Sequence, residues 1–190
     1  MKKILVIFDC FGVLCNKVCS EYFKANAKRE DIPDIYKEIM DPGELGNISR
    51  AEIFRRISKR LAIPEETVRR DIDALFVAHN DLFHLIEKIR GFADVALLSN
   101  AYEGHAETAI ERFELAPLFD RIFLSWQHGM MKPNLEFYKY CVKSFEKEYE
   151  EIYMVDDTDE NLEHLSEIGI IPIKYISAES VSAALKEYLA

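Results

Sequence analysis

The sequence lacks most of the features that mark secreted, membrane-spanning or disulfide-stabilised proteins. Only four of its 190 residues are cysteines, and none of them forms a CxxC pair or stands at zinc-finger spacing from a histidine. No apolar run approaches the length of a membrane-spanning helix. The N-terminal stretch MKKILVIFDC has neither the long apolar region nor the small-residue cleavage site of a signal peptide. We therefore expect a cytoplasmic protein whose cysteines are reduced and structural.

Positive charge is also scarce. Lysine and arginine total 24 against 34 aspartates and glutamates, which leaves a formal net charge of −10. An acidic chain without a basic tract argues against nucleic acid and against anionic membrane surfaces as partners, but a small anionic ligand needs only a local positive site. With 49% hydrophobic and 31% charged residues, the composition is that of one globular domain with room for a smaller appendage. Nothing in the sequence predicts an oligomeric state.

Short apolar runs recur along the chain and predict buried strands. They cover residues 4–8, 94–100, 121–125, 151–157 and 170–176. Helical patterns stand between the later runs, at 105–115, 135–148 and 158–169. Alternation of strands and helices predicts an α/β fold of the Rossmann type, a parallel sheet flanked by helices.

Residues 15–78 interrupt this alternation, because they contain no convincing strand pattern. They read as successive helices at 16–29, 34–40, 49–62 and 64–78, with a turn-rich break at 41–47. The sequence therefore predicts two units: an α/β core made of residues 1–14 and 79–190, and a helical cap of residues 15–78 inserted after the first strand. A helix at 81–90 returns the chain to the core.

Polar residues stand where the predicted strands end, which is where parallel α/β sheets bind ligands. They are Asp9, Ser99, Asn100, Ser125, Asp156 and Asp157. Three carboxylates that converge at one site repel each other unless a cation lies among them, and Mg²⁺ prefers oxygen ligands. Ser99 adds a hydroxyl and Lys132 adds a positive charge. A carboxylate nucleophile, a hydroxyl, a lysine and a metal ion together predict a phosphoryl-transfer site.

Four blocks in order resemble the haloacid dehalogenase (HAD) superfamily of hydrolases, in the branch with a helical cap after the first motif. They are FDCFGVL, LLSN, SWQHGMMKPNLEFY and VDDTDEN. The resemblance covers almost the whole chain. It implies a HAD-like core fold and a Mg²⁺-dependent phosphatase that acts on a small phosphorylated metabolite through an aspartyl-phosphate.

The resemblance also implies a role for individual residues. Asp9 would be the nucleophile, and Ser99 and Lys132 would complete the catalytic group. Ser99, Asn100 and Lys132 would bind the substrate. The metal would be held by Asp9, the backbone carbonyl of Phe11, Asp156 and Asp157. Asn161 matches a frequent downstream asparagine, and His105 and His128 would lie near the site. In the predicted cap, substrate contacts are expected from Glu44, Asn47 and Arg50.

Phe11 departs from the phosphatase pattern, in which a second aspartate stands two residues after the nucleophile and acts as general acid and base. Loss of such proton transfer costs roughly 10²- to 10⁴-fold in rate. The sequence therefore predicts a preference for phosphates with good leaving groups, unless a residue of the cap supplies the acid. Two alternatives stay open: a metal-free dehalogenase in which Asp9 attacks carbon, and a catalytically impaired protein that only binds its ligand.

Overall fold

The computed structural model describes residues 3–189 and is built on a parallel five-stranded sheet. Its strands have the spatial order β3-β2-β1-β4-β5, and every neighbouring pair is parallel. Their bounds are β1 Ile4–Phe8, β2 Asp94–Ser99, β3 Arg121–Leu124, β4 Glu151–Asp156 and β5 Ile171–Lys174. The predicted fold class, a parallel sheet flanked by helices, is confirmed.

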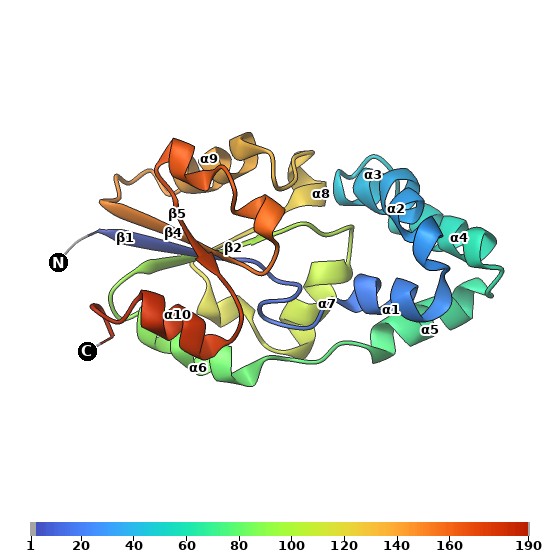
Figure 1. Ribbon diagram of the computed structural model, residues 1–190, viewed down its shortest axis with the longest axis horizontal. Coiled ribbons are helices and arrows are strands. Elements are labelled where there is room, and N and C mark those ends of the chain that lie inside the picture. Colours follow the sequence, from blue (N-terminus) through green and yellow to red (C-terminus); the bar gives the residue numbers. More distant parts are fainter. Residues whose placement is uncertain (1–2, 190) are drawn as a thin grey trace.

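Helices cover both faces of this sheet (Figure 1). The helices α6 (Asn80–Ile89) and α10 (Ala178–Ala184) lie on one face, and α9 (Leu135–Ser144) lies on the other. Alternate residues of β1 serve the two faces, as the pleat of a strand requires. Ile4, Val6 and Phe8 pack into one buried cluster, whereas Leu5 and Ile7 pack into the other. Burial on both faces explains why β1 is apolar throughout.

Between β1 and α6, residues 16–77 form a group of helices beyond the carboxyl ends of the strands, at the right of Figure 1. Its α-helices are α1 Val18–Asn26, α2 Ile32–Ile35, α3 Asp41–Glu44, α4 Arg50–Leu61 and α5 Glu65–Ala74. Residues 16–77 contain no strand. Helix α4 begins after Ser49, whose hydroxyl accepts a hydrogen bond from the Glu52 backbone at 3.3 Å and caps the helix. The apolar faces of α4 and α5 pack together. Phe54 of α4 and Val68 and Ile72 of α5 are buried in the same cluster.

Two chain segments connect these helices to the sheet, and they are hydrogen-bonded to each other. The Asn16 N–H donates to the Val77 carbonyl at 3.2 Å, and the Asn16 side chain binds the Val77 N–H at 2.9 Å. The His79 N–H donates to the Leu14 carbonyl at 2.9 Å, and Cys15 forms an antiparallel bridge with Ala78. The outgoing and returning segments therefore form one short ladder, which we call the hinge ladder.

The structure differs from the sequence-based expectation in several helices. Residues 158–169, expected as a helix, form 3-10 turns at Asp159–Asn161 and Leu165–Ile168. The Asn161 carbonyl accepts a hydrogen bond from the Tyr138 hydroxyl at 2.7 Å, in place of a bond to a backbone N–H of an α-helix. The expected break at 41–47 contains α3, and a π-helix, Tyr36–Met40, precedes it.

The remaining helical elements are short. They are α7 His105–Arg112, α8 Ser125–His128 and the 3-10 turns Arg29–Asp31 and Ala116–Leu118. Neither α8 nor α10 is among the helices predicted from the sequence. Within residues 3–189, no helix combines the length and the apolar character that crossing a bilayer requires.

Candidate active site

Three carboxylates meet at the carboxyl edge of the sheet, between its central strand and the neighbouring strand β4. Phe8 of β1 is paired with Val155 of β4, so the next residues, Asp9 and Asp156, lie side by side. The Asp9 N–H donates to the Val155 carbonyl at 2.9 Å and extends this pairing by one bond. Carboxylate oxygens of Asp9, Asp156 and Asp157 all lie within 4.8 Å of one another. The strand register thus brings Asp9 beside Asp156, and Asp157 follows directly in the chain.

Lys132 lies between two of these carboxylates. Its Nζ is 2.7 Å from Asp9 Oδ1 and 2.6 Å from Asp156 Oδ2, and its side chain is 1% exposed. Asn100 fixes the backbone of this lysine from both sides. Its Oδ1 accepts from the Lys132 N–H at 2.8 Å, and its Nδ2 donates to the Lys132 carbonyl at 2.9 Å. Asn100 therefore positions Lys132.

The two aspartates of the fourth motif have different surroundings. Asp156 is fully buried, and both of its oxygens already accept hydrogen bonds. Besides Lys132, its donors are the Thr158 N–H at 2.8 Å and the Asn161 side chain at 3.0 and 3.2 Å. Asp157 is partly exposed and forms an ion pair with Lys17 at 2.6 Å. Asp156 therefore serves to hold Lys132, whereas Asp157 keeps more of its coordinating capacity.

Gly12 explains how the Asp157 carboxylate comes so close to the loop after β1. Gly12 has a φ of +93°, a conformation that side-chain-bearing residues rarely adopt. A Cβ at this position would lie 2.5 Å from the Asp157 carboxylate. The glycine thus gives the loop its turn and leaves the space that the carboxylate occupies.

Burial and neighbouring charge control ionisation at this site. Burial raises the pKa of Asp9 to about 7, although the Lys132 ammonium group opposes this rise. Burial lowers the pKa of Lys132, but the Asp156 and Asp9 carboxylates outweigh it, so its pKa is raised above the usual range and the lysine stays protonated. An attacking Asp9 must be ionised near neutral pH, and an additional cation beside it would favour that form.

The donor set fits a hard divalent cation. Three carboxylates against the two ammonium groups of Lys132 and Lys17 leave the site with one negative charge. All candidate ligands are oxygens: the carboxylates and, as the sequence analysis implied, the backbone carbonyl of Phe11. Oxygen ligands with an uncompensated negative charge are what Mg²⁺ selects.

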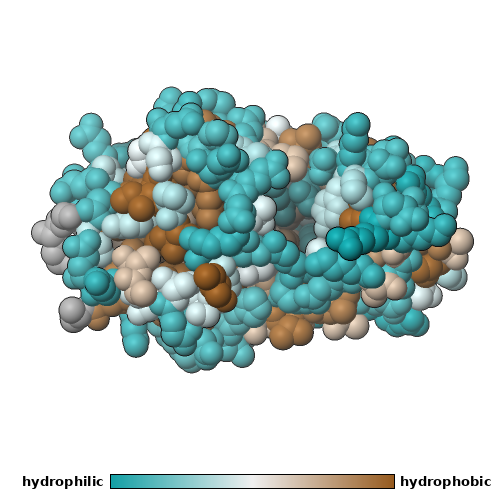
Figure 2. Space-filling view, viewed as in Figure 1, coloured by the Kyte–Doolittle hydropathy of each residue, from teal (hydrophilic) through white to brown (hydrophobic). Residues whose placement is uncertain are grey.

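A pocket of about 480 Å³ opens above Asp9 and Lys132. Val18, Cys19, Tyr36 and Glu44, from the helices between β1 and β2, form its other wall. Figure 2 shows the surface hollowed between the part that covers the sheet and the part formed by these helices. Its volume is in the range of pockets that hold small organic ligands.

Phe11 lies on the wall of this pocket with its ring fixed by other aromatic rings. The ring stacks on the His105 imidazole at 4.1 Å between centroids, and Phe76 meets it edge-on at 6.2 Å. The other face of His105 stacks on Tyr102 at 4.5 Å. His105 is buried, and its Nδ1 has no hydrogen-bond partner among residues 3–189. Phe11 therefore occupies its position as part of a packed aromatic column.

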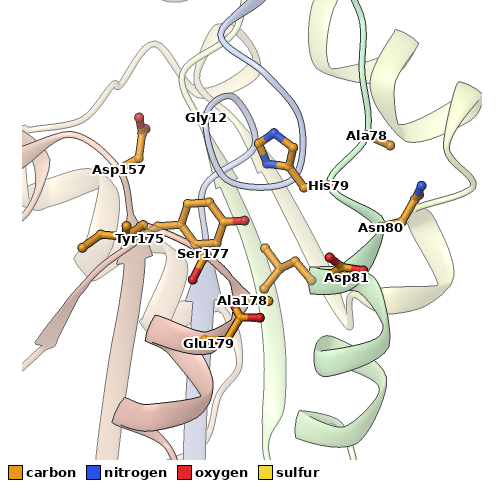
Figure 3. Close-up of a pocket in the computed structure, with 12 residues that line it drawn as sticks. Gly12, Ala78, His79, Asn80, Asp81, Asp157, Tyr175, Ser177, Ala178 and Glu179 are labelled. Atoms are coloured by element: carbon orange, nitrogen blue, oxygen red, sulfur yellow. The ribbon is translucent and has the colours of Figure 1, made fainter.

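A second pocket, of about 670 Å³, lies on the other side of Gly12. Figure 3 shows His79 and Tyr175 in it, with the Asp157 carboxylate pointing away from Tyr175 and Glu179. Neither Asp9 nor Lys132 lines this pocket. The smaller pocket, which contains both residues, is therefore the candidate active site.

Other residues proposed from the sequence have mixed placements. Ser99 is fully buried, and its Oγ lies 3.4 Å from the Asn100 carbonyl; its contact with a phosphoryl group stays a prediction. His105 lines the pocket, but His128 packs against Tyr140, at 4.8 Å between rings, and does not line it. Lys17 was not anticipated, because one lysine before a helix has no recognisable pattern and its partner is far away in sequence.

Comparison with known proteins places this arrangement in a family. Residues 5–169 match the family model of the haloacid dehalogenase-like hydrolases. The chain is 33% identical over 186 residues to a sesquiterpene phosphatase from Aspergillus oryzae, covering 95% of this chain and 94% of that protein. It is 24% identical over 162 residues to a drimenol cyclase from Aspergillus calidoustus, which covers 80% of this chain but 30% of that protein, so the chain spans less than a third of that relative's length.

Solved structures show the same fold. A HAD family enzyme from Bacteroides thetaiotaomicron, solved in complex with magnesium and inorganic phosphate, superposes with a TM-score of 0.75 at 24% identity. The match covers 93% of this chain and 96% of that one.

Proposed function

Because this chain belongs to the haloacid dehalogenase-like hydrolases, we propose that it is a Mg²⁺-dependent phosphatase acting on a small phosphorylated metabolite. The observation that carries the proposal is the position of Asp9, held by Lys132 beside two further carboxylates at the carboxyl edge of the sheet. A relative named as a phosphatase and a structural neighbour that holds magnesium and phosphate support it. The helical cap of residues 15–78 and a cytoplasmic location are also part of the proposal.

In this mechanism Asp9 attacks the phosphorus atom in line with the leaving oxygen and forms an aspartyl-phosphate. Lys132 holds the carboxylate by one oxygen, Oδ1, which leaves Oδ2 for the attack or for a metal ion. Its ammonium group also lies beside the place where negative charge gathers on the phosphoryl oxygens. Ser99 and Asn100 stay the proposed substrate contacts at the end of β2. Water then cleaves the intermediate and restores Asp9.

We assign Asp9, Asp157 and the Phe11 carbonyl as direct metal ligands, with Asp156 holding Lys132 and completing the acidic group. Both Asp156 oxygens are committed to Lys132, Thr158 and Asn161, whereas Asp157 is paired with a lysine side chain that can move aside. When bound, Mg²⁺ would neutralise the carboxylates and the phosphoryl oxygens.

The test is a screen of the purified chain against phosphorylated metabolites, with Mg²⁺ and with chelator, alongside halide release from 2-haloacids. Phosphate release that requires Mg²⁺ and disappears in Asp9→Asn supports the proposal. Halide release in chelator would show the dehalogenase alternative instead, and tight phosphate-ester binding without turnover would show the impaired protein. Asp157→Asn should weaken Mg²⁺ binding, and Asp159→Asn, at an exposed carboxylate two residues further on, is its matched control.

A further inference from the structure

The proposed reaction leaves the origin of one proton unexplained. When the bond from phosphorus to the leaving oxygen breaks, an alkyl oxygen needs a proton to depart. The Phe11 side chain has no acidic proton, and its ring is packed between His105 and Phe76. Any donor must therefore come from another group that lines the same pocket.

Most groups in the pocket are unsuited to this role. Burial and the nearby Arg50 charge lower the pKa of His105 to about 3, so its ring is neutral near pH 7. Lys17 is paired with Asp157, and Lys132 is paired with two carboxylates. A neutral imidazole and lysines held by carboxylates are poor proton donors to a leaving group.

Glu44 is in the opposite situation. It is the last residue of α3, it lines the pocket that Asp9 and Lys132 also line, and it is half-buried. Its carboxyl group forms no hydrogen bond or ion pair within residues 3–189. A carboxyl group that faces a reaction pocket and has no partner of its own is available to the ligand.

Two glycines allow close approaches around the helix that carries Glu44. A Cβ on Gly46 would collide with the Trp126 carbonyl, and Gly46 adopts a φ of +73°. A Cβ on Gly43 would run into Ile53 and lie 3.5 Å from Tyr102 Cβ. Both glycines let α3 and the residues after it approach α8 and Tyr102, which places Glu44 over the pocket.

The charges around Glu44 keep its proton in place near neutral pH. Burial raises its pKa to about 8, the Asp41 and Asp9 carboxylates add to the rise, and Lys132 opposes it. Cys19 and Tyr36 also face Glu44; both are neutral, because burial raises the pKa of each above its ordinary value. A protonated carboxyl group at pH 7 is what a general acid needs.

The geometry points to Glu44 as the general acid and base of this enzyme, in place of the carboxyl group that Phe11 lacks; this rests on the proposed phosphatase function. In the first step the Asp9 carboxylate forms a bond to phosphorus, the bond to the leaving oxygen breaks, and that oxygen takes the Glu44 proton. In the second step water attacks phosphorus, the Glu44 carboxylate takes a proton from the water, and the bond between Asp9 and phosphorus breaks. Glu44 ends protonated, as it began.

The test compares two leaving groups in Glu44→Gln, with the Mg²⁺-loaded protein. For an alkyl phosphate, kcat/KM should fall roughly 10²- to 10⁴-fold, because the departing alkoxide loses its proton donor. For p-nitrophenyl phosphate, whose leaving group needs no proton, kcat/KM should change less than about tenfold. The second step loses its base with either substrate, so the variant should release a burst of p-nitrophenol equivalent to one phosphoenzyme per chain.

Asp41→Asn is the matched control, because Asp41 is a carboxylate on the same helix and lines the same pocket. At a pH well below the pKa of Glu44, where Glu44 is protonated in both proteins, it should show no dependence of its loss on the leaving group. A second measurement uses the unmodified protein. Its kcat/KM for the alkyl phosphate should fall as pH rises through the pKa of Glu44, whereas its kcat/KM for p-nitrophenyl phosphate should not fall. Removing the Asp41 charge lowers that pKa, so the alkyl limb should move to lower pH in Asp41→Asn.

Equal losses for both leaving groups in Glu44→Gln, or no loss, would overturn the assignment while leaving the phosphatase function intact. Absence of phosphate release from every ester by the unmodified protein would overturn the proposed function and this inference with it.

Discussion

Replacing Lys132 by methionine tests how the acidic site is held together. The substitution keeps much of the side-chain volume but removes the ammonium group that lies 2.7 Å from Asp9 and 2.6 Å from Asp156. Because Lys132 is 1% exposed, water cannot take the place of its charge. Removing one partner of a buried ion pair costs about 3–5 kcal/mol. That is a large part of the roughly 5–15 kcal/mol that stabilises a typical domain.

The measurement is urea unfolding at pH 8 in chelator, followed by circular dichroism. Lys139→Met provides the matched control, because Lys139 pairs with Glu136 at 2.8 Å but is 51% exposed. An exposed pair contributes about 1 kcal/mol or less, so the control should lose at most that amount. The difference between the two variants then measures the effect of burial on the same chemical change.

The loss in Lys132→Met should depend on pH and on metal. Burial raises the pKa of Asp9 to about 7 even beside Lys132, and loss of the lysine raises it further. A carboxyl group with a raised folded-state pKa loses stability as pH rises from its unfolded value toward the folded one. The part of the cost that comes from Asp9 should therefore be small near pH 5, where Asp9 is protonated in both folded proteins, and should grow as pH rises above about 7. Mg²⁺ should restore part of it. A loss below about 1 kcal/mol at pH 8, or an equal loss at pH 5, would refute the assignment of the energy to buried charge.

Three further predictions follow from individual residues. Gly12→Ala should weaken Mg²⁺ binding about 10- to 100-fold in calorimetry, because its methyl group needs the space of the Asp157 carboxylate; unchanged affinity would contradict this. Ser49→Ala should lower the free energy of unfolding by about 1 kcal/mol in urea, since the Glu52 N–H loses its cap, and Ser49→Gly should lose less. Glu44→Gln should gain stability relative to the unmodified protein as pH rises from about 4.5 to about 8, the window set by its raised pKa, and level off above. A stability difference that does not change with pH would count against a protonated Glu44.

Sequence reasoning located the parts of the site that strand order determines. Asp9 and Asp156 end neighbouring parallel strands, so recognising the strands was enough to bring them together. Lys17 was missed because its contact with Asp157 depends on how the helices after β1 sit against the sheet. The same limit applied to Glu44, which the sequence placed only among the residues expected to contact substrate from the cap.

Local structure was less predictable where side chains compete for backbone groups. The stretch 158–169 has the composition of a helix, yet it forms 3-10 turns. The Asn161 side chain donates a hydrogen bond to Asp156, and the Asn161 carbonyl accepts one from the Tyr138 hydroxyl. Neither contact leaves a periodic pattern in the sequence, so propensity alone assigns the wrong structure there.

The hinge ladder limits how the helices between β1 and β2 can move. A body attached by one flexible linker can turn about three axes, whereas two linkers bonded to each other act as a single flat strap. The Asn16 bonds to Val77 and the His79 bond to Leu14 tie these linkers together, and bending across the strap keeps those bonds while twisting breaks them. We therefore expect the softest motion of these helices to be rotation about one axis, and such a rotation would change the distance between Glu44 and Asp9.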